Sequence, residues 1–167
     1  GKIKILDFSL SIYEALRPYI SNQFKLYVKW PNDILIEEKK CAGILANFES
    51  KSQLLVIGLG VNVNSNLDTN DRISLSTLLN QDLSIKELLN DIIEGLNRNV
   101  DAILSGTIDS NQYNKNAAYI DKEIQVLENG IWITGTFKGI NSNANATILM
   151  GNEIRTAHSG TSFRLKA

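Results

Sequence analysis

The chain has 167 residues, of which 43% are hydrophobic and 21% are charged, so its composition is that of an ordinary globular protein and disfavours disorder. Its formal net charge is -1, so no overall positive field favours binding to nucleic acid or to an anionic membrane surface. A single cysteine, Cys41, and a single histidine, His158, exclude an internal disulfide and a conventional Cys/His metal cluster.

The chain begins with a predicted amphipathic helix, because apolar side chains recur at helical spacing over residues 6–20. Pro18 is expected to distort or end its last turn, since proline removes a backbone donor and clashes with the preceding turn. Residues 25–30 then alternate between apolar and polar side chains, which predicts a half-buried strand. Asn32 and Asp33 mark a turn after it.

Three segments after this turn predict a sheet. Residues 34–36 and 43–48 indicate two short strands, and the charged residues 37–40 between them indicate the tip of a hairpin. A further apolar strand is predicted over residues 54–63. Strands in direct succession favour antiparallel pairs over a repeated βαβ arrangement, so the predicted fold class is α+β with a mixed, largely antiparallel sheet.

A long helix is the most strongly marked element of the second half. Ser84 and Glu87 have the spacing of a capping box, in which the serine accepts a hydrogen bond from an early helix N–H. An apolar stripe at helical spacing continues from there to Leu104, and Gly106 can end the helix. A shorter helix is predicted near residues 111–118.

From about Ile120 onward the chain changes to brief strands separated by asparagine and glycine. Asn129-Gly130 between two apolar runs is a strong hairpin signal, because both residues tolerate the positive φ of a type I′ turn. Several such strands in so short a segment predict a small SH3-like β-barrel. The predicted division of the chain is therefore residues 1–118 and residues 119–167.

The candidate chemistry gathers around the first predicted hairpin. Lys29 and Lys40 flank it, and two cations near one sheet edge could meet an anion. Asn32 and Asp33 offer an amide and a carboxylate for a sugar hydroxyl, a base edge or a phosphate-bound cation. Glycines remove Cβ atoms where a ligand could lie against the backbone, and the candidates are Gly43, Gly58 and Gly60.

Each of these features also has a plain structural explanation. A lysine at a hairpin tip is usually a solvated charge, and a Gly-x-Gly within a strand is more often a bulge or a close packing contact. The glycine pair forms no dinucleotide fingerprint, because Val63 stands where a third glycine would be needed. Trp30 would ordinarily lie in a core, Cys41 would be an inert buried thiol, and His158 would be a structural or surface residue.

Taken in order along the chain, these residues resemble the signature of the biotin protein ligase family. The similar segments, at the spacing of the family, are Lys29-Trp30-Pro31-Asn32-Asp33, Lys40-Cys41-Ala42-Gly43-Ile44-Leu45 and Val56-Ile57-Gly58-Leu59-Gly60-Val61-Asn62-Val63. The resemblance also extends to the preceding helix, residues 75–79, the long helix and the predicted barrel, so it covers essentially the whole chain. It implies part of a class II synthetase-like ligase core, followed by an SH3-like C-terminal barrel.

The resemblance implies an ATP-dependent reaction in two steps. The biotin carboxylate attacks the α-phosphate of ATP to give biotinyl-5′-AMP, and a lysine of a biotin carboxyl carrier protein domain then attacks that mixed anhydride. Biotin, ATP and Mg²⁺ are the expected small molecules, and positioned cations are the expected catalytic devices because negative charge gathers around phosphorus. A cytoplasmic protein with no nucleic-acid or membrane partner is expected, since the sequence shows no signal-peptide pattern and no apolar run of about 18 residues.

The resemblance also implies roles for particular residues. Lys40 would contact the biotin carboxylate and the α-phosphate, and Lys29 would assist with phosphate. Further contacts to biotin or biotinyl-AMP are implied for Gly43, Ile44, Leu45, Gly58 and Gly60. Nucleotide contacts are implied for Lys29, Asn32, Asp33 and Asn62, with Asp33 also at the magnesium ion.

Two features depart from the family pattern. The Gly-Arg-Gly-Arg-type loop that folds over biotin in this family is not found here, so the chain alone is expected to have an incomplete pocket and to be inactive without an upstream segment. Asn47 stands where many members have glutamate. Three functions stay open: a ligase present in part, a non-catalytic module that binds a carrier or partner, and a relative of lipoate or octanoate transferases. A homodimer, or association with a missing N-terminal half, stays open as well.

Overall fold

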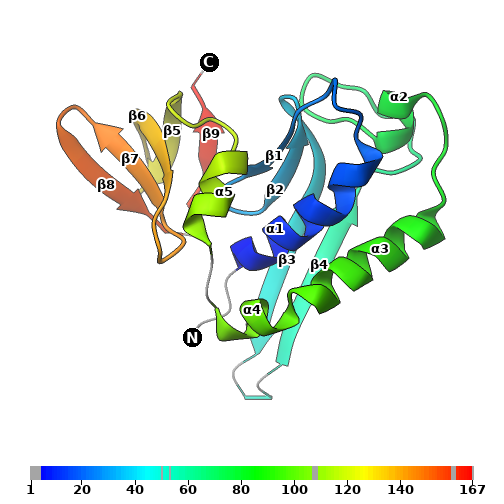
Figure 1. Cartoon of the computed structure of the whole chain (residues 1–167). Coiled ribbons are helices and arrows are strands. Elements are labelled where there is room, and N and C mark those ends of the chain that lie inside the picture. The colour runs from blue at the N-terminus through cyan, green and yellow to red at the C-terminus, as the bar shows by residue number, and fades with distance from the viewer. Residues whose placement is uncertain (1–4, 50, 53, 107–108, 159–160, 167) are drawn as a thin grey trace.

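The computed structural model describes residues 5–49, 51–52, 54–106, 109–158 and 161–166, which form an α+β fold with helices and antiparallel sheets (Figure 1). The elements of the first part are α1 (Ile5–Leu16), the 3-10 helix η1 (Arg17–Tyr19), β1 (Leu26–Lys29), β2 (Asp33–Ile36), β3 (Lys39–Glu49), β4 (Leu54–Val61) and α2 (Leu75–Leu79). The remaining elements are α3 (Ile85–Arg98), α4 (Val100–Ser105), α5 (Ser110–Asn116), β5 (Glu123–Glu128), β6 (Ile131–Ile140), β7 (Ala146–Met150), β8 (Glu153–Ala157) and β9 (Phe163–Leu165). The predicted fold class is confirmed.

The first sheet has the strand order β1-β2-β3-β4, and all its described pairs are antiparallel. The predicted hairpin is present, but the position of its tip is wrong in one respect. Lys39 and Lys40 do not belong to the tip, because they pair with Ile36 and Leu35 as the first residues of β3. Lys40 is therefore held in a strand by its backbone.

Helix α1 packs against the first sheet, and α3 packs against α1, so both helices lie on one side of that sheet (Figure 1). The side chains of Ile12 and Leu16 are buried beneath them. As predicted, the regular helix stops before Pro18, which lies in the 3-10 helix η1. The face of the first sheet under α1 thus forms part of the hydrophobic core, and these helices leave the opposite face uncovered.

The predicted long helix is interrupted, which corrects the expectation of one helix up to Leu104. Ser84 caps α3 as predicted, accepting a hydrogen bond from the N–H of Glu87. The break falls at Asn99, whose side-chain amide donates to Ser11 Oγ at 3.1 Å and to a carboxylate oxygen of α1. Tertiary hydrogen bonds therefore end α3, and α4 begins at the next residue.

The apolar stripe along α3 and α4 is buried in part. Leu88, Ile92 and Ile103 are buried, whereas others remain exposed on the outer side of the two helices. The exposed side chains are Ile85, Leu89, Ile93, Val100 and Leu104. No helix in the described ranges is both long and apolar enough to cross a membrane.

The second sheet has the strand order β8-β7-β6-β5-β9. The predicted hairpin joins β5 to β6, and both turn residues have positive φ, 50° at Asn129 and 79° at Gly130. Among the described residues no pairing joins the outer strands β8 and β9, so closure into an SH3-like barrel stays a prediction. The division at residues 118 and 119 also stays a prediction.

Trp30 joins the two sheets. Its side chain is 1% exposed, its ring N–H donates to the carbonyl oxygen of Ala144 at 3.1 Å, and its ring meets the edge of Phe163. On α5, the amide of Asn114 donates to the carbonyl oxygen of Ile140 and accepts from its N–H. One continuous hydrophobic core therefore runs under both sheets.

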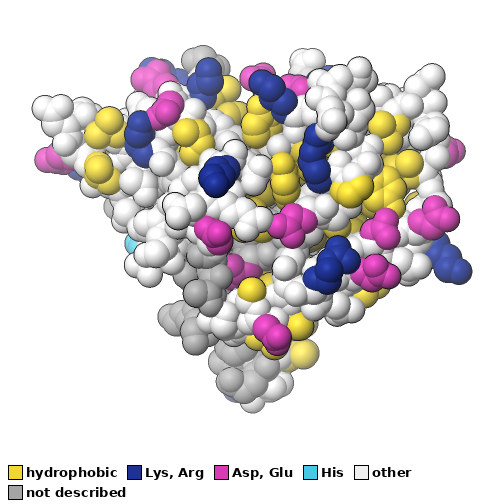
Figure 2. Space-filling view, in the orientation of Figure 1, with side chains coloured by type: hydrophobic (Ala, Val, Ile, Leu, Met, Phe, Trp, Pro, Cys, Tyr) yellow, Lys and Arg dark blue, Asp and Glu magenta, His cyan; other side chains and the backbone are white. Residues whose placement is uncertain are grey.

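Charged side chains of both signs alternate over the face that Figure 2 shows. Neither sign dominates that face, which agrees with the net charge of -1 for the whole sequence. This face therefore offers no continuous basic surface of the kind that nucleic-acid binding needs.

Candidate functional site

An open groove of about 540 Å³ follows β3 and β4. It is lined by Asn32, Lys40, Cys41, Ala42, Gly43, Ile44, Leu45, Gly58, Leu59, Gly60, Val61, Asn62 and Arg72. The groove thus contains most of the residues that the sequence pointed to. Lys29 and Asp33 lie beside it and are not part of the described lining.

Glycines form the floor of the groove. Gly43 pairs with Gly60 across the two strands, and Leu45 pairs with Gly58. A Cβ built on Gly58 would come no closer than 3.9 Å to Leu45, and one on Gly60 would lie 4.0 Å from the carbonyl oxygen of Gly43. The space above these two glycines is therefore not filled by packed side chains, and a ligand can approach the backbone there.

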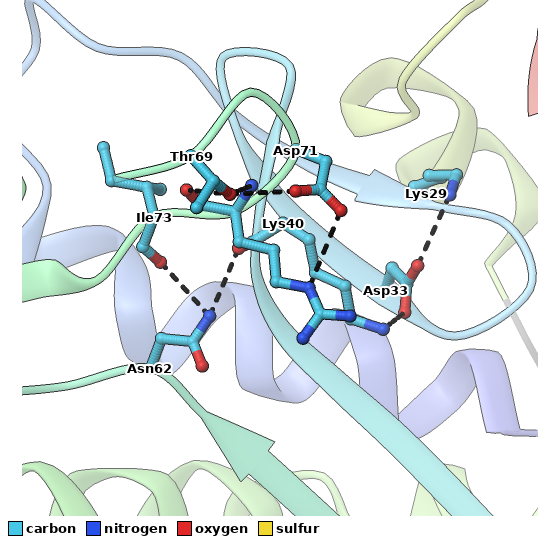
Figure 3. A network of polar contacts seen from close by, with 8 residues as sticks. Lys29, Asp33, Lys40, Asn62, Thr69, Asp71 and Ile73 are labelled. Carbon is cyan, nitrogen blue, oxygen red and sulfur yellow. Dashed lines mark hydrogen bonds and ion pairs between the residues drawn. The ribbon is translucent and has the colours of Figure 1, made fainter. Parts of the chain in front are cut away.

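Both lysines point toward one carboxylate, that of Asp33 (Figure 3). Lys40 Nζ lies 2.6 Å from Asp33 Oδ1, and Lys29 Nζ lies 3.4 Å from Asp33 Oδ2. The strand register places Lys29 opposite Asp33, and it places Asp33 opposite Gly43, whose missing Cβ leaves room for the Lys40 ammonium group. A ligand anion at Lys40 would therefore compete with, or add to, an existing ion pair.

Gly43 makes room for this ion pair. A Cβ at this position would lie 2.9 Å from Lys40 Nζ and 3.3 Å from Asp33 Oδ1. The first distance is below any normal contact, so a side chain here would push the lysine away from the carboxylate. Glycine at position 43 therefore lets the Lys40 ammonium group reach Asp33 and also forms part of the groove floor.

Two asparagines hold the frame of the groove. The Asn32 amide donates to the carbonyl oxygen of Ile44 at 2.8 Å, and Ile44 N–H donates back to the carbonyl oxygen of Asn32. The Asn62 amide donates to the carbonyl oxygens of Lys40 and Ile73, at 3.4 and 3.3 Å (Figure 3). Both side chains thus fix backbone next to the candidate ligand space, and their nucleotide contacts stay predictions.

Comparisons with known proteins agree with this arrangement. A sequence profile of the Biotin/lipoate A/B protein ligase family matches residues 2–64. The bifunctional ligase/repressor BirA of Bacillus spizizenii is 48% identical over 44 residues, which are 25% of this chain and 14% of that protein. The biotin–[acetyl-CoA-carboxylase] ligase of Paracoccus denitrificans is 36% identical over 58 residues, or 33% of this chain and 24% of that protein. The matched segments thus span less than a quarter of these relatives.

The solved structures extend the similarity over nearly the whole chain. The biotin protein ligase of Aquifex aeolicus in complex with biotin and ATP has a TM-score of 0.85 at 26% identity, covering 97% of this chain and 71% of that chain. Residues 2–64 thus match the biotin/lipoate protein ligase family, and the chain has a fold similar to that of a biotin protein ligase. The fold is shared by the Leishmania major biotin protein ligase in complex with biotinyl-5-AMP. That structure has a TM-score of 0.55 at 17% identity, covering 94% of this chain and 71% of that chain.

Neighbouring residues of β3 face opposite sides of the sheet. Leu45 is 71% exposed and presents its side chain on the open side, whereas Ile44 is completely buried on the helix side. Ile44 therefore contributes backbone to the groove. Cys41 is also buried, and burial raises the pKa of its thiol to about 12, so it is the unreactive thiol that the sequence predicted.

Three other residues near the groove were not recognised from the sequence. Tyr113 of α5 is completely buried, and burial, together with the negative charge of Asp33, raises the pKa of its hydroxyl. The pKa of Tyr119 is raised as well, first by burial and then by the charges of Glu38 and Asp33. Arg72 lines the groove from the segment before α2. All three lie outside the three segments that resemble the ligase family signature, so no local sequence pattern could mark them.

No magnesium site made of protein ligands alone is found among the described residues. No three His, Cys, Asp or Glu side chains come together within the ranges that the structure describes. Both oxygens of Asp33 already face ammonium groups. Because Mg²⁺ is usually held by one or two carboxylates together with substrate phosphates and water, these observations do not test the magnesium role of Asp33, which stays a prediction.

Proposed function

We propose that this chain carries the biotin- and nucleotide-binding groove of a biotin protein ligase. In the proposed reaction the biotin carboxylate attacks the α-phosphate of ATP, and the bond from that phosphorus to the leaving pyrophosphate breaks. The product is biotinyl-5′-AMP. A lysine amine of a biotin carboxyl carrier protein then attacks the acyl carbon, which releases AMP and a proton and leaves biotin on the carrier.

The proposal rests on one observation above all: a glycine-floored groove with a strand-held ammonium group, in a ligase-family fold. Lys40 lies in the groove, and its backbone is held in β3. In the proposed complex its charge stabilises the negative charge that builds up between carboxylate and α-phosphate, and such a group typically contributes about 3–4 kcal/mol to the transition state. Lys29 supports the site through Asp33, which both ammonium groups share.

The groove also offers two chemically different ends to the two proposed substrates. Leu45 and Gly58 form an apolar, open end that suits the ring system of biotin. Lys40 and Asn62 form a polar end that suits the nucleotide. We assign residues 1–118 to the partial catalytic unit and residues 119–167 to an SH3-like unit, which Trp30 fastens beside the groove.

The test is titration calorimetry of the 167-residue chain with a biotinyl-adenylate analogue that carries an uncleavable acyl-sulfamate linkage. Lys40→Ala is expected to weaken binding about 10–100-fold, the range for losing a hydrogen bond to a charged group. Lys86→Ala, an exposed lysine on α3, is the matched control and should bind as the wild type does. Failure of the wild-type chain to bind, or equal binding by Lys40→Ala, would contradict the proposal.

Two other functions can be separated in the same assay. A lipoate or octanoate transferase relative would prefer the octanoyl-adenylate analogue over the biotinyl one. A non-catalytic carrier-binding module would bind a carrier domain but neither analogue. Preference for the biotinyl compound is the outcome that the proposed function requires.

A further inference from the structure

Arg72 is the second cation of the groove, and backbone contacts place it beside Lys40. The N–H of Lys40 donates to the carbonyl oxygen of Asp71 at 2.8 Å, and the N–H of Ile73 donates to the carbonyl oxygen of Lys40 at 3.1 Å. Residues 40 and 72 thereby form a parallel bridge. The loop before α2 thus crosses the start of β3 at the residue proposed to meet the phosphate.

The backbone of Arg72 is fixed by a closed turn. Its N–H donates to Thr69 Oγ1 at 3.1 Å, and its carbonyl oxygen accepts from the N–H of Thr69 at 2.9 Å. Figure 3 shows Thr69, Asp71 and Ile73 near Lys40, and it shows Asn62, whose side-chain amide donates to the carbonyl oxygens of Lys40 and Ile73. The position of residue 72 is therefore set by its backbone, and its side chain can contact a ligand.

The two cations of the groove differ in how far they are already neutralised. Lys40 has Asp33 at 2.6 Å. Arg72 has Asp71 at 3.7 Å from Nε, with both side chains well exposed, and such an exposed pair contributes little. No aspartate or glutamate belongs to the described groove lining. The guanidinium group is therefore the less neutralised of the two charges.

We propose that Arg72 binds the phosphate oxygens of the nucleotide and so fixes the direction in which the substrates lie in the groove. The planar guanidinium group presents paired N–H donors that match two oxygens of a phosphate. Arg72, Lys40 and Asn62 gather at one end, and the apolar residue Leu45 lies toward the other end. This inference rests on the proposed function and adds to it a phosphate-binding residue and an orientation.

The experiment is titration calorimetry of the 167-residue chain with inorganic pyrophosphate, ATP and adenosine. Arg72→Ala is expected to weaken binding of ATP and pyrophosphate about 10-fold or more while adenosine binds unchanged, because a charge-assisted hydrogen bond is lost. Arg72→Lys should recover part of the loss, since it keeps the charge but not the paired donors. Arg98→Ala removes another exposed arginine with a distant carboxylate partner, at 3.9 Å, and should change nothing.

Three results would overturn the inference. If Arg72→Ala binds ATP as the wild type does while Lys40→Ala does not, the proposed function survives and the role of Arg72 is wrong. If adenosine binding falls as much as ATP binding, Arg72 does not act on phosphate. If the wild-type chain binds neither ATP nor pyrophosphate, both the inference and the proposed function fail. Because Arg72 is exposed and its backbone contacts remain, a thermal melt should show all variants folded.

Discussion

Two strand glycines, Gly60 in the first sheet and Gly135 in the second, show how differently the two sheets use the same residue. A Cβ on Gly60 would meet nothing nearer than a backbone oxygen at 4.0 Å. A Cβ on Gly135 would lie 2.5 Å from Ile148 Cγ2 and 2.9 Å from the carbonyl oxygen of Leu149. The first glycine leaves space open for a ligand, and the second lets the protein fill its own core.

The same contrast extends to the side chains around each glycine. The second sheet packs on an aromatic cluster, in which Phe163 contacts Phe137 at 5.0 Å and Trp30 at 5.6 Å between ring centroids. The first sheet buries one face under α1 but keeps Leu45 exposed on the other face. A packed core thus lies beside an open groove, and ligand sites are usually such pre-formed hollows.

Trp30→Ala should have the largest effect, because this side chain belongs to both regions. The variant loses a fully buried ring, its contact with Phe163 and its hydrogen bond to Ala144, and we expect a loss of about 3–5 kcal/mol in the free energy of unfolding. Urea denaturation followed by circular dichroism measures it. Trp132→Ala is the control: this ring is 37% exposed under Arg164, and it should cost about 1 kcal/mol or less. Equal losses would mean that Trp30 does not join the sheets.

Gly135→Ala should come next. The added methyl group has no room beside Ile148 and Leu149, and overpacking of this kind typically costs about 1–3 kcal/mol. The same denaturation experiment applies, and a crystal structure of the variant should show β7 displaced from β6. A variant as stable as the wild type would show that the second sheet has room for a methyl group at position 135.

Gly60→Ala should have the smallest effect on stability. The methyl group enters open space, so we expect a change within about 0.5 kcal/mol, or a slight gain from a less flexible unfolded chain. Binding is expected to respond differently, because the methyl group occupies the floor on which the ligand would lie. The biotinyl-adenylate analogue should bind less tightly to this variant in calorimetry. A destabilised variant, or one with unchanged binding, would remove the functional difference between the two glycines.

Much of the fold follows from local sequence. The apolar periodicity of residues 6–20, the cap at Ser84 and the turn at Asn129-Gly130 each act through neighbours a few residues away, and the structure has all three. The glycines of the groove and the lysine beside them were also visible in the sequence, because they form short segments that resemble the ligase family. Their position around one groove follows from the register of β3 and β4.

Other features were decided by the tertiary structure. Asn99 ends α3 through hydrogen bonds to α1, Asp33 takes both lysines as partners, and Arg72 reaches the groove across a loop crossing. The sequence by itself determined most of the helices and strands, the resemblance to the ligase family and the candidate residues, because propensity, capping, turn chemistry and short motifs are local. Only the tertiary structure decided which charges are neutralised and which face stays open, since an ion pair or an uncovered face depends on segments that are distant in the chain.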